Sequence, residues 1–224
     1  PACRSLDCVS VFAHTVADSW QVLSLLSGVD PQDAYSRRIE ALPPLVRKVR
    51  FGIPAPLEFL GDVQAEQAFA AARAALGKHA EFEFVDIPFD PFVEVARLLY
   101  EGPWVAERWL AVGDFFADQG HHMDPAVREV IAQAEGKTAL DAFEAMHRLE
   151  SAKRMTEATF EKIDILLVPT SPTIHTRATI ATAPIPRNSD FGYYTNFVNL
   201  LGLCALALPG PFRRDALPAG LTLI

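Results

Sequence analysis

Apolar residues recur along the chain at spacings that predict both helices and strands. The first helix is expected between Thr15 and Gly28, because threonine commonly caps helix N-termini and glycine commonly ends helices. Its apolar residues fall at helical spacing, which predicts one buried face made by Val16, Trp20, Leu23 and Leu26. Asp30-Pro31 and Pro43-Pro44 then predict a loop region.

A strand, a helix and a second strand are predicted next. Val46 to Ile53 roughly alternates between apolar and charged residues, and Glu81 to Ile87 alternates strictly, so both are expected to be strands. Between them lies an alanine-rich helix, Ala65 to Leu76, which Asp62 opens and Gly77 closes. This order is typical of a βαβ unit in a parallel sheet with a right-handed crossover.

The middle of the chain is predicted to be helical. Helical stretches run from Pro91 to Tyr100, Trp104 to Leu110 and Pro125 to Ala134, and Gly102-Pro103 separates the first two. A long helix is expected from Thr138, whose spacing from Asp141 resembles a capping box. Its apolar face is expected to contain Leu140, Phe143, Met146, Leu149, Ala152 and Met155 and to continue toward Phe160.

The last third of the chain is predicted to add strands to the sheet. Asp164 to Val168 is almost uninterruptedly apolar, as in a strand buried on both faces. The remaining segments are predicted to be a long surface loop (Thr170 to Asn188), a helix (Phe191 to Leu201), a second buried strand (Leu203 to Leu208) and a strand that reaches the end of the sequence (Leu221 to Ile224). Together the patterns predict one α/β domain that is incomplete at both ends.

Composition excludes several classes of protein. The chain has 224 residues and a net charge of −8, so a broad surface for binding nucleic acid is not expected. It has neither a signal peptide nor an apolar run near the ~18 residues of a membrane span, so no membrane association is expected. The three cysteines, Cys3, Cys8 and Cys204, lack the spacing of a disulfide framework or a zinc site. We therefore expect reduced thiols, no metal, no cofactor and a cytoplasmic location.

Residue types alone identify no catalytic centre, but the break at Gly102-Pro103 lies between two residues that are candidates for substrate binding. Tyr100 precedes the break and Arg108 follows it, so the bend can direct a phenol and a guanidinium toward one pocket. A guanidinium suits a planar carboxylate, and a phenol can orient a carbonyl or amide. The alternative is structural: Tyr100 closes a helix face and Arg108 pairs with Glu101 or Asp114. Spacing alone favours this alternative.

Several segments together resemble the amidase signature family. Asp164 to Pro172 is similar to the family's buried strand and Pro-Thr turn, Thr195 to Gly202 with Leu203 to Pro209 to a late helix-to-strand element, and Gly220 to Ile224 to the strand that follows. Within the family, the segment Ala2 to Ala13 and the segment Asn199 to Pro209, with Cys204, most resemble allophanate hydrolases. The resemblance covers essentially the whole chain.

The resemblance implies a large α/β fold around a mixed sheet with helices on both sides. It also implies amide hydrolysis by a serine nucleophile, a bridging cis-serine and a lysine, all located upstream of the segment that matches Pro1. Residues 1–224 are therefore expected to be the C-terminal portion of one amidase-signature domain, inactive when isolated. We assign no residue of this chain to the triad. Lys48, Ser5 and Ser10 have suitable side chains but are not given these roles.

The resemblance also gives Tyr100 and Arg108 a role. Allophanate hydrolases hold their substrate with a tyrosine and an arginine eight positions apart, and these two residues match in type, spacing and position. Allophanate carries a carboxylate at one end and a urea-like amide at the other, and its hydrolysis yields ammonia and carbon dioxide. Thr195 and Asn196 are expected to cap the helix that follows them rather than to line the cleft.

Two other functions stay open at this point. Another amidase-family enzyme, such as the A subunit of the glutamine-dependent transfer-RNA amidotransferase, would share the Pro-Thr strand. A non-catalytic segment or assembly subunit would agree with the missing triad. The expected partner is a small amide substrate. The sequence does not determine the oligomeric state, so a homodimer is left open, nor does it choose between urea and triazine breakdown.

Overall fold

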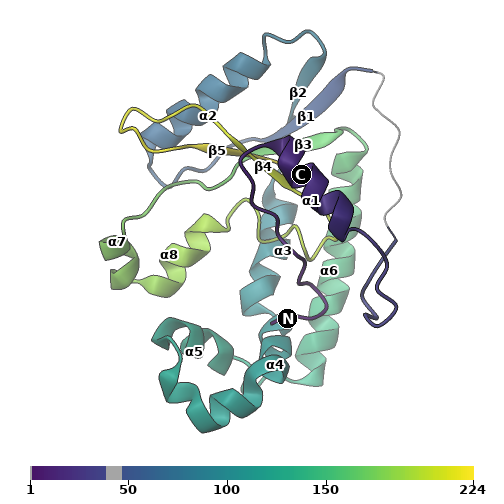
Figure 1. The fold of residues 1–224 in the computed structure, drawn as a ribbon, viewed down its shortest axis with the longest axis vertical. Helices are drawn as coiled ribbons and strands as arrows, with labels where there is room; N and C mark the ends of the chain where they lie inside the picture. Colours follow the sequence, from purple (N-terminus) through teal and green to yellow (C-terminus); the bar gives the residue numbers. More distant parts are fainter. Residues whose placement is uncertain (1, 39–46) are drawn as a thin grey trace.

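A five-stranded mixed sheet forms the centre of the protein, with helices on both of its faces (Figure 1). The structure is a computed structural model and describes residues 2–38 and 47–224. The strand order is β2-β1-β3-β5-β4, and the strands are β1 (Val49–Pro54), β2 (Phe82–Ile87), β3 (Ile165–Pro169), β4 (Leu206–Pro209) and β5 (Gly220–Leu223). The prediction that these five segments share one sheet is confirmed; Pro43-Pro44 and Val46 lie outside the described residues.

The first part of the sheet is the predicted βαβ unit. Strands β1 and β2 pair in parallel, and helix α2 (Val63–Leu76) connects them. The Asp62 side chain caps this helix by accepting hydrogen bonds from the N–H groups of Gln64 and Ala65. Strand β3 lies in parallel on the other side of β1. Gly52 of β1 leaves room for the side chain of Ile163, which precedes β3, since a Cβ atom at Gly52 would lie 2.5 Å from that side chain.

The second part of the sheet is antiparallel. Strand β5 pairs with both β3 and β4, so β4 is an edge strand. The prediction of a buried strand at Leu203 to Leu208 is wrong on two points. The strand begins later, at Leu206, and none of its residues is buried, because no described strand covers its outer edge.

Two apolar cores flank the sheet, and β3 contributes to both. Leu166 and Val168 belong to the core that helices α3 (Asp90–Glu101) and α6 (Ala139–Phe160) cover. Leu167 points to the opposite core, which α2 covers. Because successive side chains of a strand point to opposite faces, β3 is buried on both sides, as its continuous apolar sequence predicted.

The helix break at Gly102-Pro103 is confirmed. Helix α3 ends at Glu101 and α4 (Trp104–Gln119) begins after Pro103, extending beyond the predicted Leu110. Gly102 allows a sharp turn, since a Cβ atom there would lie 2.3 Å from the carbonyl oxygen of Leu98. A short 3-10 turn (Gly120–His122) and α5 (Pro125–Ala132) follow.

The capping box of α6 is confirmed, but its predicted buried face is only partly right. Of the predicted residues, Leu149 and Ala152 are buried, whereas Leu140, Phe143, Met146 and Met155 are exposed. The buried stripe consists of Ala145, Leu149, Ala152, Thr156 and Thr159. These residues recur at helical spacing, and most are small, so α6 can pack closely against α3.

Helix α1 (Val16–Leu26) is capped by Thr15 as predicted, but it buries none of its residues. Trp20, for example, is 68% exposed. The predicted buried face is therefore wrong for this chain, because no described element covers it. None of the described helices is long and apolar enough to cross a membrane.

The segment before β4 also differs from the prediction. The expected surface loop contains helices α7 (Arg177–Thr182) and α8 (Pro184–Phe191). Proline is compatible with the first turn of a helix, where its missing N–H group is not needed, and this explains why Pro184 begins α8. The helix predicted from Phe191 to Leu201 is replaced by consecutive turns, such as the one closed by the hydrogen bond from Thr195 N–H to Gly192 O.

Candidate functional site

Tyr100 and Arg108 meet across the break between α3 and α4. The guanidinium carbon of Arg108 lies over the Tyr100 ring, 4.8 Å from its centre. Tyr100 is in the last turn of α3 and Arg108 in the second turn of α4, so the bend at Gly102-Pro103 directs both side chains to one place. A cation over an aromatic face is attracted by the ring quadrupole, which holds the guanidinium in position.

The hydrogen-bonding edge of Arg108 remains available. Within residues 2–38 and 47–224, Arg108 forms no ion pair or hydrogen bond, and the alternative pairing with Glu101 or Asp114 is not observed. The contact with the ring is made over the guanidinium carbon, and the five N–H donors of the guanidinium form no hydrogen bond to the described residues. The pair can therefore bind a carboxylate through the planar donor fork of Arg108, with the phenol of Tyr100 beside it.

Glu107, the residue before Arg108, binds the N-terminal segment Ala2–Asp7. One carboxylate oxygen accepts a hydrogen bond from Ser5 N–H at 2.6 Å. The other accepts from the Ser5 hydroxyl at 2.5 Å and from the Cys3 thiol at 3.1 Å. Sequence reasoning missed this contact, since the partners are 102 and 104 positions apart and no local motif connects them.

Cys3 has no nucleophilic character in this environment. Its side chain is buried, with 2% of the residue exposed. Burial, followed by the hydrogen bond and the negative charge of Glu107, raises the pKa of the Cys3 thiol to about 12, against a smaller lowering by the positive charge of Arg108. The thiol is therefore protonated at neutral pH and serves as a hydrogen-bond donor to Glu107.

The N-terminal segment is itself an ordered turn. The Asp7 carboxylate accepts hydrogen bonds from the N–H groups of Ala2 and Cys3, at 2.7 and 3.1 Å. On its other side, Leu6 O accepts from the Asn199 side chain at 2.9 Å. Two anchors, Glu107 and Asn199, thus fix the turn beside the start of α4, where the N-terminus lies in Figure 1.

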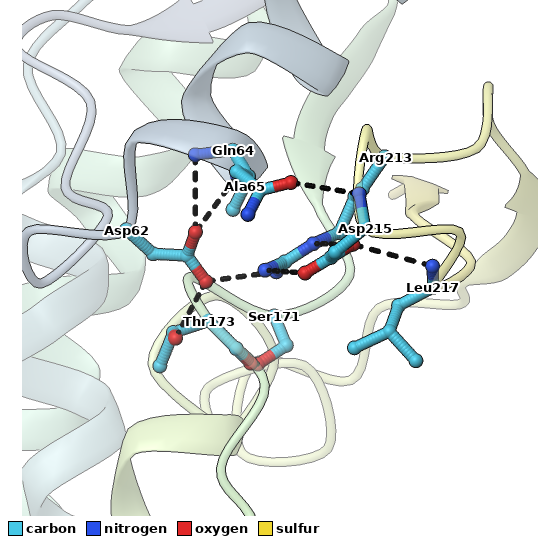
Figure 2. A network of polar contacts seen from close by, with 8 residues as sticks. All are labelled: Asp62, Gln64, Ala65, Ser171, Thr173, Arg213, Asp215 and Leu217. Atoms are coloured by element: carbon cyan, nitrogen blue, oxygen red, sulfur yellow. Dashed lines mark hydrogen bonds and ion pairs between the residues drawn. The ribbon is translucent and has the colours of Figure 1, made fainter.

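A second polar cluster joins three segments near the N-terminal end of α2 and the C-terminal end of β3 (Figure 2). Asp62 accepts hydrogen bonds from Thr173 Oγ1 at 2.9 Å and from Arg213 at 2.8 Å, in addition to capping α2. The other nitrogens of the Arg213 fork bind Asp215. Partial burial raises the pKa of Asp62, but its hydrogen bonds to Ala65, Thr173 and Arg213 outweigh this, and the net pKa is below its ordinary value.

A cavity of about 280 Å³ lies beside this cluster. Its walls come from α2, the Pro169–Ile174 segment, and the two ends of the connection between β4 and β5. The polar side chains in the walls are already paired, Thr170 with Thr222 and Ser171 with the backbone of Thr173. We therefore interpret the Asp62–Arg213 cluster as a structural tie and the Tyr100–Arg108 pair as the candidate ligand site.

The remaining candidate residues have no ligand-binding arrangement. Among residues 2–38 and 47–224, no group of three His, Cys, Asp or Glu side chains is placed to hold a metal ion. The helix that Thr195 and Asn196 were expected to cap is absent, so that interpretation is wrong. The side chain of Asn196 instead packs on Gly192. A Cβ atom on Gly192 would lie 2.1 Å from the side-chain oxygen of Asn196.

Comparison with known proteins identifies the family. The amidase family matches the chain over residues 1–224. The chain belongs to the amidase family. The family resemblance of its strand and turn segments is thereby confirmed.

Three relatives show how far the similarity extends within the amidase family. The urea amidolyase of Lachancea kluyveri is 39% identical over the whole of this chain, which spans 12% of that protein. The structure of the Kluyveromyces lactis allophanate hydrolase is 36% identical, with a TM-score of 0.94 over all of this chain and 37% of that one. The A subunit of the glutamyl-tRNA(Gln) amidotransferase of Synechococcus elongatus is 27% identical over 98% of this chain and 51% of its own length. The predicted α/β fold, with its mixed sheet covered on both sides, is confirmed.

Proposed function

We propose that residues 1–224 are the C-terminal portion of one amidase domain in an allophanate hydrolase, and that Tyr100 and Arg108 bind the substrate. The chain spans only a small part of the urea amidolyase and allophanate hydrolase that it resembles. The serine, cis-serine and lysine of the family mechanism belong, in this proposal, to a segment upstream of residue 1. The chain therefore contributes substrate binding rather than the nucleophile.

The geometry of the Tyr100–Arg108 pair carries the proposal. The guanidinium is held over the ring at 4.8 Å, and its donor edge is not used by another described side chain. In allophanate the carboxylate and the carbamoyl group are joined through one nitrogen. Arg108 can hold the carboxylate by two parallel N–H···O bonds, while the Tyr100 hydroxyl orients the carbamoyl group for attack.

The comparisons favour allophanate over the transfer-RNA amidotransferase reaction. Identity is 39% to the urea amidolyase and 36% to the allophanate hydrolase, against 27% to the amidotransferase subunit. We expect a cytoplasmic enzyme, because its three cysteines are unpaired. The choice between monomer and homodimer is left to sedimentation analysis of the full-length protein.

The test is ammonia release by the full-length protein from allophanate and from acetamide, which lacks the carboxylate. We expect a kcat/KM for allophanate at least about tenfold higher, the contribution of one charge-assisted interaction of about 1.5 kcal/mol. Equal values for both amides would identify a general amidase instead. Turnover of glutamine but not allophanate would favour the amidotransferase class.

A further inference from the structure

Glu107 connects the start of α4 to the N-terminal segment Ala2–Asp7. Both of its carboxylate oxygens are used, and all three donors come from Cys3 and Ser5. Ser5 contributes both its N–H and its hydroxyl, so the carboxylate grips one residue at two points. Hydrogen bonds to a carboxylate are shorter and stronger than those between neutral groups, which makes this a firm connection.

The connection lies directly beside the candidate substrate site. Glu107 and Arg108 are consecutive residues of α4, so their side chains diverge by about 100° around the helix. Glu107 points to the N-terminal segment and Arg108 to the Tyr100 ring. Fixing the Glu107 carboxylate therefore fixes the rotation of the first turns of α4, and with it the place of the Arg108 guanidinium.

We propose that Glu107 is a positioning residue that sets the distance between Arg108 and the catalytic segment. This inference rests on the proposed function, in which the nucleophile precedes the segment Ala2–Asp7 in the chain. That segment is then the physical link between the nucleophile and the substrate's carboxylate. A shift of about 1 Å along this link misplaces the carbamoyl carbon relative to the serine and lowers the rate.

A positioning role predicts that Glu107 acts through Arg108. In the full-length enzyme, Glu107→Ala should lower kcat/KM for allophanate at least about tenfold, with kcat falling as well as KM rising. Glu107→Gln retains the length and one acceptor oxygen, so it should recover part of this loss. Once Arg108 is replaced by alanine, Glu107→Ala should cost no more than about twofold further, because no guanidinium is left to position.

The experiment is a double-mutant cycle of Glu107→Ala and Arg108→Ala, assayed well below the melting temperature of each variant. Asp114→Asn is the matched control, since it alters an exposed carboxylate on the same helix. Hydrogen exchange of the Ser5 amide should become faster in Glu107→Ala and stay unchanged in Asp114→Asn. If Glu107→Ala does not fold, Glu107→Gln and Ser5→Ala replace it in the cycle.

Additive losses in the cycle, or a Glu107→Ala enzyme within twofold of wild type, would overturn the positioning role. So would an unchanged Ser5 exchange rate. Wild-type activity separates this inference from the proposed function. If the wild-type enzyme hydrolyses allophanate and the cycle is additive, only the role of Glu107 is lost; if it does not hydrolyse allophanate, both proposals fail.

Discussion

The guanidinium of Arg108 lies over the ring of Tyr100, with its central carbon 4.8 Å from the ring centre. The two residues are eight positions apart, on different helices, and they meet because the chain bends sharply at Gly102-Pro103. Stacking restrains the guanidinium while leaving its donors free to bind a ligand. The arrangement suits a small molecule with a carboxylate beside a carbonyl group.

Replacing the tyrosine hydroxyl should have a modest effect. Tyr100→Phe retains the ring and the stacking, and removes one hydrogen bond worth about 1 kcal/mol, so kcat/KM for allophanate should fall about fivefold in the full-length enzyme. Tyr35→Phe, at an exposed position in a turn, is the control and should have no effect. An unchanged kcat/KM for Tyr100→Phe would show that the hydroxyl does not contact the substrate.

The 224-residue chain on its own should not hydrolyse allophanate. The proposal assigns the serine, cis-serine and lysine to an upstream segment, without which the nucleophile is not formed. The measurement is ammonia release by the isolated chain and by the full-length protein at equal concentration. Turnover by the isolated chain that resists serine-directed inhibitors would mean that the catalytic groups lie within residues 1–224.

Asp164 should make the protein sensitive to acid. Its carboxylate, with 8% of the side chain exposed, binds Arg47 at 2.6 Å and Arg50 at 3.0 Å. The hydrogen bonds from Arg47 and then Arg50 hold the pKa of Asp164 well below its usual range. Since the folded pKa is depressed, this stabilisation is present above the unfolded value of about 3.9 and is lost as the pH falls further.

Asp164→Asn tests this contribution. The variant should lower the free energy of unfolding at pH 7 by about 2 kcal/mol, a value reduced by the solvent exposure of Arg47, and its difference from wild type should shrink below about pH 4. Urea denaturation across this pH range measures both effects. Asp86→Asn is the control, since this exposed carboxylate lies 4.0 Å from Arg73. A difference that does not change with pH would contradict the assignment.

Arg213 should stabilise the fold without taking part in binding. Its side chain is 7% exposed and binds two carboxylates, those of Asp62 and Asp215. Arg213→Ala removes the cationic partner of both carboxylates, so the free energy of unfolding should fall by about 2–3 kcal/mol while KM for allophanate is unchanged. Arg214→Ala, at the exposed neighbouring position, should cost less than about 0.5 kcal/mol. A raised KM for Arg213→Ala would instead assign the adjacent cavity to the substrate.

The sequence predicted the parts of the fold that local patterns determine. Capping residues located α1, α2 and α6 at Thr15, Asp62 and Thr138, and the apolar run before Pro169 located the central strand. Alternation located β1 and β2. The predicted start of β1, Val46, lies outside the described residues. Each of these signals acts over a few residues and does not depend on distant partners.

The errors arise where distant partners decide the structure. Helix α1 has an apolar face, but no described element covers it, and in α6 the buried stripe uses alanines and threonines rather than larger neighbours such as Phe143. Sequence placed Tyr100 and Arg108 in the candidate site by their spacing and the family resemblance. It missed Glu107, because the three hydrogen bonds that distinguish it come from residues about a hundred positions away.

The kinetics of Arg108 variants on allophanate test the central claim most directly. A guanidinium–carboxylate pair in a partly desolvated site contributes about 1.5–3 kcal/mol, so Arg108→Ala in the full-length enzyme should lower kcat/KM about 10- to 150-fold. Arg108→Lys keeps the charge but loses the planar fork and should fall between this variant and wild type. If Arg108→Ala instead stays within about twofold of wild type and only its stability changes, Arg108 does not bind the substrate and the account is contradicted.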